Sequence, residues 1–195
     1  MKILKIIIDE IKIFLMFFIH FCPGKMGVLI RKFVLKTMLK EMGSKFHSEI
    51  GLIITGYENI IIKNNCSFMR HSSINADENG VVKIGNNISV NYNVNINACN
   101  DGYIEIGNDV LIGQNTVIRA SDHNTSDQKK ISYQGHSGGK IIIGNNVWIG
   151  ANCVILKNVK IDDNSVIGAG TVINKDVKKN EIVVGNQQRV VKNIS

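Results

Sequence analysis

The sequence is poor in proline, aromatic residues and paired cysteines. It has one proline in 195 positions, 6% aromatic residues and four scattered cysteines, Cys22, Cys66, Cys99 and Cys153, without a C-x-x-C pair. This cysteine pattern predicts neither a disulfide framework nor a zinc site, and it favours free thiols in a reducing compartment. With 44% hydrophobic residues, the composition is that of one principal folded domain and not of a disordered or fibrous chain.

Long uncharged hydrophobic runs are also missing. The longest at the N-terminus covers residues 13–22, about half of the roughly 20 apolar residues that a membrane-spanning helix needs, and no small-residue cleavage site follows it. Residues 1–47 nevertheless hold nine Lys and Arg against three Asp and Glu, whereas the rest of the chain is nearly balanced. We therefore predict an apolar, basic helical segment that lies on a membrane surface or packs on protein.

An aliphatic or aromatic residue recurs every six positions. The series groups in threes: Ile62, Phe68 and Ile74; Ile84, Val90 and Ile96; Ile106, Ile112 and Ile118; Ile143, Ile149 and Ile155; Ile161, Ile167 and Ile173. A period of six, with three short strands per turn, predicts five coils of a β-solenoid whose inward side chains fill a narrow column.

The distance between coils locates the insertions. Successive coils are 22, 22, 37 and 18 residues apart, and the extra residues always follow the third member of a set, so the insertions leave from one corner. Another corner would stack residues that tolerate left-handed backbone, namely Asn65, Asn87, Asp109, Asn146 and Asn164. We divide the chain into a helical segment 1–47, a β-solenoid 48–178 with an inserted loop 122–140, and a tail 179–195.

The segments I143-G-N-N-V-W-I-G-A-N152 and I167-G-A-G-T171 strongly resemble the hexapeptide-repeat acyltransferases. The branch they most resemble contains the galactoside and maltose acetyltransferases and the O-acetyltransferases of bacterial surface polysaccharides. The resemblance covers about residues 60–192. It implies a left-handed parallel β-helix, a homotrimer with active sites between neighbouring copies, and acetyl-CoA as cosubstrate without a metal.

The resemblance assigns chemistry to two polar residues. His123, at the root of the long insertion, matches the histidine that takes the proton of the acceptor hydroxyl. Asn93 matches the asparagine that orients that hydroxyl, although the four asparagines of residues 91–97 could equally decorate an outer face. His136, in Gln134-Gly135-His136, is expected at the rim of the acceptor pocket and not in catalysis.

The same resemblance assigns the coenzyme site. Trp148 matches a residue of the coenzyme groove between copies, and the amide of Ala151 matches the group that binds the thioester oxygen. Further coenzyme contacts would come from Ala169, Asn174, Lys175 and Arg189. Gln187 stands where relatives commonly have proline, which puts the position of Arg189 in doubt.

The function predicted from the sequence is acetyl transfer to a sugar hydroxyl of a lipopolysaccharide or capsule precursor, in the cytoplasm and at the inner face of its membrane. The alternative enzyme acetylates a small soluble acceptor such as a free or nucleotide sugar, serine or an antibiotic. A scaffold that kept the repeat without catalysis is the non-enzymatic alternative. Nucleic-acid binding is disfavoured because the basic residues lie on an apolar helix.

Overall fold

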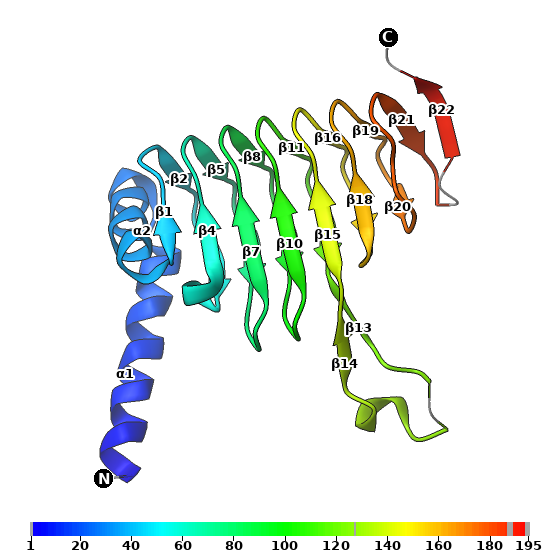
Figure 1. Cartoon of the computed structure of the whole chain (residues 1–195). Helices are drawn as coiled ribbons and strands as arrows, with labels where there is room; N and C mark the ends of the chain where they lie inside the picture. The colour runs from blue at the N-terminus through cyan, green and yellow to red at the C-terminus, as the bar shows by residue number, and fades with distance from the viewer. Residues whose placement is uncertain (1, 127, 187–188, 194–195) are drawn as a thin grey trace.

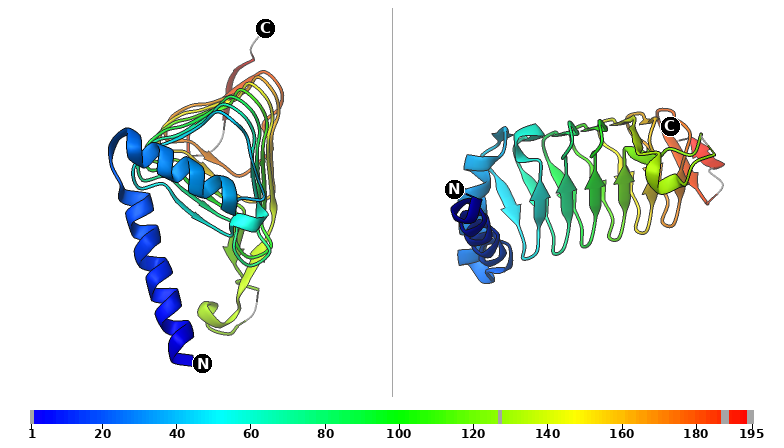
Figure 2. Two further views of the ribbon diagram at one scale, coloured as in Figure 1. Left: turned by 90° about the vertical axis from the view of Figure 1, so that its left-hand side faces the viewer. Right: turned by 90° about the horizontal axis from the view of Figure 1, so that it is seen from below.

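The computed structural model describes residues 2–126, 128–186 and 189–193. Most of them wind into a three-sided left-handed β-helix, in which each coil places one strand in each of three parallel sheets (Figure 1). Seen along its axis, the column is triangular, with the coils superposed (Figure 2). The solenoid predicted from the repeat is confirmed, and so is the left hand that the resemblance implies.

The three sheets run the length of the column. Sheet A contains β1 (Glu41–Met42), β4 (Ile60–Ile62), β7 (Val81–Ile84), β10 (Tyr103–Ile106), β15 (Lys140–Ile143) and β18 (Val159–Ile161). Sheet B contains β2 (Phe46–Ser48), β5 (Cys66–Phe68), β8 (Ile88–Val90), β11 (Leu111–Ile112), β16 (Trp148–Ile149), β19 (Val166–Ile167), β21 (Glu181–Val184) and β22 (Arg189–Asn193). Sheet C contains β3 (Ile53–Thr55), β6 (Ser73–Asn75), β9 (Asn95–Asn97), β12 (Val117–Arg119), β17 (Val154–Ile155) and β20 (Val172–Ile173).

The repeating apolar residues point into the column. All fifteen members of the predicted series are at most 3% exposed, and they form one continuous core. Phe68, which is fully buried, packs its ring 5.6 Å from that of Phe46. Burial of this kind is the main favourable contribution to folding, and here it repeats at every coil.

Two corners are tight turns built on left-handed backbone. At the corner between sheets A and B, Asn65, Asn87 and Asp109 have φ near 60°, and the side-chain amides of Asn65 and Asn87 donate to the next coil at 2.9 and 2.8 Å. Asn146 donates to Asn164 in the same way at 2.9 Å. The predicted stack is therefore confirmed. The corner between sheets B and C has a second set with positive φ: Gly51, His71, Asn93, Asn115, Asn152 and Gly170.

The third corner, between sheets C and A, carries the insertions, as predicted. The longest is a protruding loop with β13 (Ser121–His123), the 3₁₀ turn η2 (Ile131–Tyr133) and β14 (His136–Gly138) (Figure 1). A shorter 3₁₀ turn, η1 (Tyr57–Asn59), leaves the first coil at the same corner.

The structure adds a coil that the repeat does not predict. Strands β1, β2 and β3 pair with β4, β5 and β6, so the column has six coils where five were expected. Within the segment 1–47, predicted to be helical, the last helix ends at Met38, and Glu41 and Met42 are in a strand that pairs with Ile61 and Ile62. In the added coil the inward position opposite Phe68 is Ser48, a polar residue that interrupts the apolar series.

Two helices occupy the N-terminal end. α2 (Gly24–Met38) crosses the open end of the column, and α1 (Lys2–Phe21) extends away from it (Figures 1 and 2). The buried guanidinium of Arg31 joins them to the first coil, because it donates to the carbonyl oxygens of Cys22 at 2.7 Å and Ser48 at 3.0 Å. Over the residues that the structure describes, no helix combines the length and the apolar character needed to cross a membrane.

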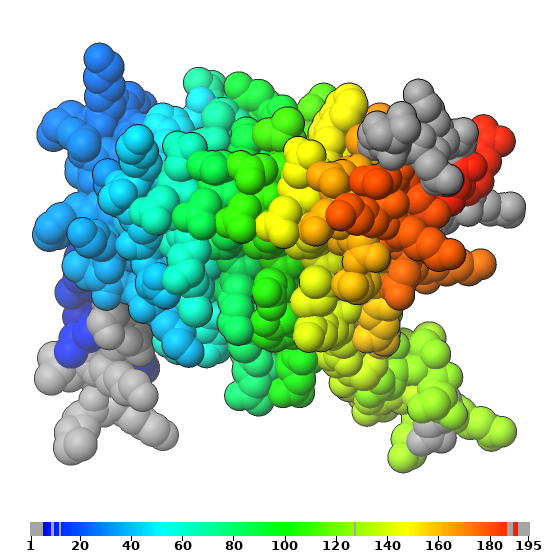
Figure 3. Space-filling model, turned by 45° about the horizontal axis from the view of Figure 1, so that its top comes forward, coloured from blue at the N-terminus to red at the C-terminus, as the bar shows by residue number. Residues whose placement is uncertain are grey.

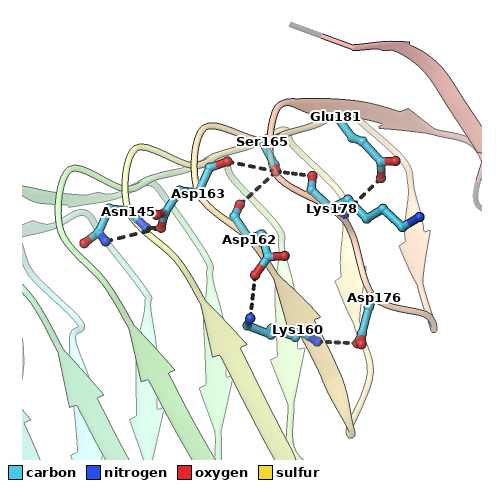
Figure 4. Close-up of polar contacts among 8 residues, drawn as sticks. All are labelled: Asn145, Lys160, Asp162, Asp163, Ser165, Asp176, Lys178 and Glu181. Carbon is cyan, nitrogen blue, oxygen red and sulfur yellow. Dashed lines mark hydrogen bonds and ion pairs between the residues drawn. The ribbon is translucent and has the colours of Figure 1, made fainter.

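Polar contacts hold the last coils at the opposite end (Figure 4). The buried Ser165 hydroxyl lies 2.8 Å from the carbonyl oxygen of Asp162 and 3.0 Å from that of Lys178. The carboxylate of Asp176 accepts the backbone N–H of Lys160 at 2.8 Å. Beyond them β21 pairs antiparallel with β22, so the parallel stacking ends in a hairpin.

Candidate active site

His123 lies on an antiparallel hairpin at the base of the insertion. β13 pairs with β14 so that His123 stands opposite His136, and the two rings lie 4.1 Å apart between centroids at an interplanar angle of 40°. Both side chains are exposed. Asn124 closes the hairpin, because its backbone N–H donates to Gly135 and its side-chain amide to the carbonyl of Gln134, each at 3.0 Å.

The neighbouring residues fix this hairpin to the column. Asp122 and Ser137 form the next pair, and Lys157, from the loop after β17, approaches both. Its ammonium lies 2.8 Å from the Ser137 hydroxyl and 3.5 Å from the Asp122 carboxylate. Because successive side chains of a strand point to opposite faces, these contacts leave the histidine face free.

The buried root of the hairpin holds one further polar group. Ser121 is fully buried, and its hydroxyl has no hydrogen-bond partner among the described residues. The carbonyl oxygen of Ser121 accepts a hydrogen bond from Nε of Arg119 at 3.0 Å. Arg119 pairs in register with Asn97, whose side-chain oxygen accepts the N–H of Cys99 at 3.0 Å. Arg119 and Asn97 are therefore among the polar residues of sheet C at the edge that leads to His123.

Asn93 lies at a different corner from His123. It precedes β9, has φ of 55° and donates its amide to Asn115 at 3.0 Å, as one member of the left-handed turns between sheets B and C. His123 follows β12, the strand that pairs with β9. Within one chain, sheet C therefore separates the two residues, and this chain alone does not bring them together.

Ala151 and Ala169 share the corner of Asn93. Each follows a glycine of sheet B, and the turns stack closely: a Cβ atom added to Gly113 would lie 2.5 Å from the nitrogen of Ala151, and one added to Gly150 would lie 2.6 Å from that of Ala169. Substitution of either glycine would thus displace the amide predicted to bind the coenzyme.

Trp148 stands on the outer surface of sheet B. Its side chain is 56% exposed and lies between Leu111, 52% exposed, and the half-buried Val166 on the adjacent strands. A groove of about 540 Å³ runs beside them, with Asn146, Asn164 and Lys179 on its polar side. The structure thus gives Trp148 an exposed apolar setting next to a groove.

The remaining predicted coenzyme contacts lie in two separate places. Asn174 and Lys175 follow β20, at the same edge of sheet C as His123. Arg189 begins β22 and is exposed, paired opposite Val184. Gln187 lies outside the described residues. The site residues thus fall into three groups: Asn93, Ala151 and Ala169 at one edge of sheet C beside Trp148, His123 with Asn174 and Lys175 at the other edge, and Arg189 at the end of the column.

Sequence reasoning missed the surroundings of His123. It placed His136 at the rim and did not foresee the ring contact, and it gave no role to Asp122 or Lys157. The insertion lacks the six-residue period, so no pattern predicts which of its residues pair; Gly135, with φ of 71°, is the one local sign of a turn. Among the described residues, no three His, Cys, Asp or Glu side chains gather as metal ligands would.

The chain folds as a left-handed β-helix with hexapeptide repeats. Residues 140–175 match the family model "Bacterial transferase hexapeptide (six repeats)". A comparison with curated proteins gives no match. Among solved structures, a variant of AntD, an N-acyltransferase from Bacillus cereus in complex with dTDP and coenzyme A, has a TM-score of 0.74 at 22% identity, covering 85% of this chain and 89% of that one.

Two further structures extend the comparison. A maltose O-acetyltransferase from Clostridium difficile 630 has a TM-score of 0.61 at 28% identity, covering 85% of this chain and 75% of its own. A hexapeptide-repeat acetyltransferase from Vibrio cholerae O1 biovar eltor, complexed with acetyl coenzyme A, has a TM-score of 0.55 at 23% identity, covering 85% and 76%. The resemblance to hexapeptide-repeat acyltransferases is thus confirmed in repeat and in fold.

Proposed function

We propose that the protein is an acetyl-CoA-dependent O-acetyltransferase that modifies a sugar hydroxyl of a bacterial surface polysaccharide or its precursor. The observation that carries the proposal is the exposed His123, held on a hairpin at the edge of a hexapeptide column. The similar structures support it, since they include acyltransferases complexed with coenzyme A or acetyl coenzyme A, and one named for maltose. Four free cysteines fit a reducing, cytoplasmic setting.

The reaction follows from the roles of two groups of the protein. His123 accepts the proton of the acceptor hydroxyl as its oxygen attacks the thioester carbonyl carbon. The Ala151 amide donates to the oxyanion of the tetrahedral intermediate. The carbon–sulfur bond then breaks, and the coenzyme thiolate takes the proton from His123, so the products are an acetyl ester and free coenzyme A.

A second copy of the chain completes the site. His123 and the group formed by Asn93, Ala151 and Trp148 lie on opposite sides of sheet C within one chain, so we propose that His123 faces that group on a neighbouring copy in a homotrimer. The exposed row of Leu111 and Trp148 supports such an interface. A monomer in light scattering at micromolar concentration would refute the shared site.

A soluble acceptor is the second candidate. It is favoured by AntD, whose structures include a complex with dTDP-4-amino-4,6-dideoxyglucose. A transfer assay with free sugars, nucleotide sugars and isolated surface glycan separates the two: acetate on the nucleotide sugar alone would favour the soluble acceptor, and an acetylated amino group would make the reaction N-acylation.

The decisive variant is His123→Ala. Loss of a positioned general base typically lowers kcat by ~10²–10⁴-fold, whereas affinity for the coenzyme, measured by calorimetry, should change little because His123 is not one of the proposed coenzyme contacts. His47→Ala, an exposed histidine on sheet B, is the matched control and should retain activity. Near-normal turnover of His123→Ala, or a loss explained by unfolding, would show that His123 is not the base.

A further inference from the structure

The outward surface of the N-terminal end combines apolar and basic side chains. α2 turns Gly27, Arg31 and Leu35 toward the column, where they are buried. At about 100° per residue, the opposite side of the helix carries Lys25, Lys32 and Lys36 in one sector and Met26, Leu29 and Phe33 in the next. The three apolar side chains are 67%, 62% and 74% exposed.

Opposite charge is missing from α2 itself. The α2 sequence contains four basic residues and no acidic one, and its three outward lysines take part in no salt bridge with a described residue. Lys25 and Lys36 are exposed, and Lys32 is half-buried. An apolar sector beside an unpaired basic sector is the composition of a helix that lies in a lipid interface.

α1 enlarges the same surface. It projects from the start of α2 at the N-terminal end of the column, away from the C-terminal strands (Figures 2 and 3). Phe14, Leu15, Phe17 and Phe18 are each more than half exposed, although the last turn of the helix is fixed through Arg31. A groove of about 440 Å³ at the junction of the two helices is lined by apolar side chains that include Phe17, Phe21 and Ile30.

We propose that this surface, formed by the outward side of α2 and the exposed apolar residues of α1, docks on an anionic lipid membrane. The apolar side chains enter the interface and the lysines meet lipid phosphates. Self-association through the same surface is disfavoured, because it would bring two sets of lysines together. The docking deepens the proposed function by placing the enzyme beside a membrane-bound acceptor; that last step alone rests on the proposed function.

The test is flotation of the full chain with vesicles of equimolar phosphatidylglycerol and phosphatidylcholine. We expect flotation on these vesicles, little on pure phosphatidylcholine, and a decrease at high salt. Each lysine near an anionic surface contributes roughly five-fold to binding, so Lys25→Gln with Lys32→Gln and Lys36→Gln should weaken it by more than ten-fold.

An apolar variant and its control complete the experiment. Leu29→Glu with Phe33→Glu should abolish flotation without unfolding, since both side chains point to solvent. Val190→Glu, at the other end of the column and 49% exposed, should float as before. Failure of the wild type to float, or equal flotation of all variants, overturns the proposal. So does a change of oligomeric state in the Leu29/Phe33 variant with flotation intact. Flotation needs neither coenzyme nor acceptor, so inactive protein that still floats would refute the proposed function and not the docking.

Discussion

Replacing Arg31 with methionine should detach the N-terminal helices from the column. Arg31 is 1% exposed and forms no salt bridge with an acidic residue that the structure describes; its guanidinium donates to Cys22 and Ser48, and at 3.2 and 3.4 Å to the carbonyls of Ile19 and His20. The carbonyl oxygens of Ile19, His20 and Cys22 lie at the C-terminal end of α1. Carbonyl oxygens at a helix C-terminus have no N–H donor within the helix and carry partial negative charge. Arg31 therefore supplies donors to these carbonyls, of which that of His20 also accepts the N–H of Gly51, and it adds a positive charge.

The magnitude follows from these bonds and from the cost of burying a charge. A hydrogen bond to a charged group is worth about 1.5–3 kcal/mol, and two of the contacts are short, which gives a gross loss of about 3–6 kcal/mol. Desolvation of the charge opposes the stabilisation by these hydrogen bonds. Burial lowers the pKa of Arg31, because the charged guanidinium is less well solvated there than in water. We expect a net decrease of about 2–3 kcal/mol in the free energy of unfolding.

Urea unfolding and hydrogen exchange check this value. Exchange should rise in the last turn of α1 and in α2, whereas the central coils should keep their protection. Lys32→Met is the matched control; its side chain makes no hydrogen bond to a described residue, so a change within about 0.5 kcal/mol is expected. If Arg31→Met and Lys32→Met lower stability equally, or if exchange in α1 stays unchanged, the assigned role of Arg31 is wrong.

Two predictions concern pH. Desolvation lowers the pKa of His20, whose Nδ1 lies 2.5 Å from the carbonyl oxygen of Leu52, so its neutral form contributes stability that is present above about pH 6.5 and is lost as the pH falls. His20→Asn, which keeps a donor and does not titrate, should flatten the stability profile between pH 7 and 5; an unchanged slope contradicts this. Burial raises the pKa of the Cys66 thiol to about 11, so its contribution is complete below the unfolded-state value of about 8.5 and is lost as the pH rises through 11. Cys66→Ala should lose less stability than the wild type over that range in urea unfolding, and parallel profiles would refute the assignment.

The repeat could be predicted because each coil uses the same two physical rules. Inward side chains must be apolar, and tight corners must tolerate left-handed backbone. The residue types of Ile62 and Asn65 therefore predict an inward position and a corner position from the local sequence alone. The first coil was not predicted, because Ser48 breaks the apolar series. Its spacing to the next coil also differs from the others: Ser48 pairs with Phe68, 20 residues further on. Ser48 belongs to the core because Arg31 bonds to its hydroxyl at 3.3 Å, a contact made across 17 residues that no local pattern records.

The sequence proposes the residues of the candidate site, but it does not predict their arrangement. The position of His123 follows from the insertion, because the coil spacing shows where the repeat is interrupted. Its contact with His136 depends on the pairing of β13 with β14, and its anchoring depends on Lys157 from the following coil. Both are tertiary contacts between segments that have no shared period.

The location of His123 has a physical reason that joins the fold to the proposed chemistry. At two corners of the column, side-chain amides and left-handed residues link successive coils, so an inserted residue would break contacts with the coil on either side. The corner between sheets C and A also has left-handed residues, Gly56, Asn79, Asp101 and Asn158, but its loops vary in length, and those after β6 and β9 are longer than the turns at the other two corners. An insertion there leaves the six-residue register intact: Ile118 and Ile155 still pair in sheet C across it. A polar hairpin with a basic side chain can therefore be added at this corner without a break in the apolar series, while the stacked corners hold the Ala151 and Ala169 amides in position.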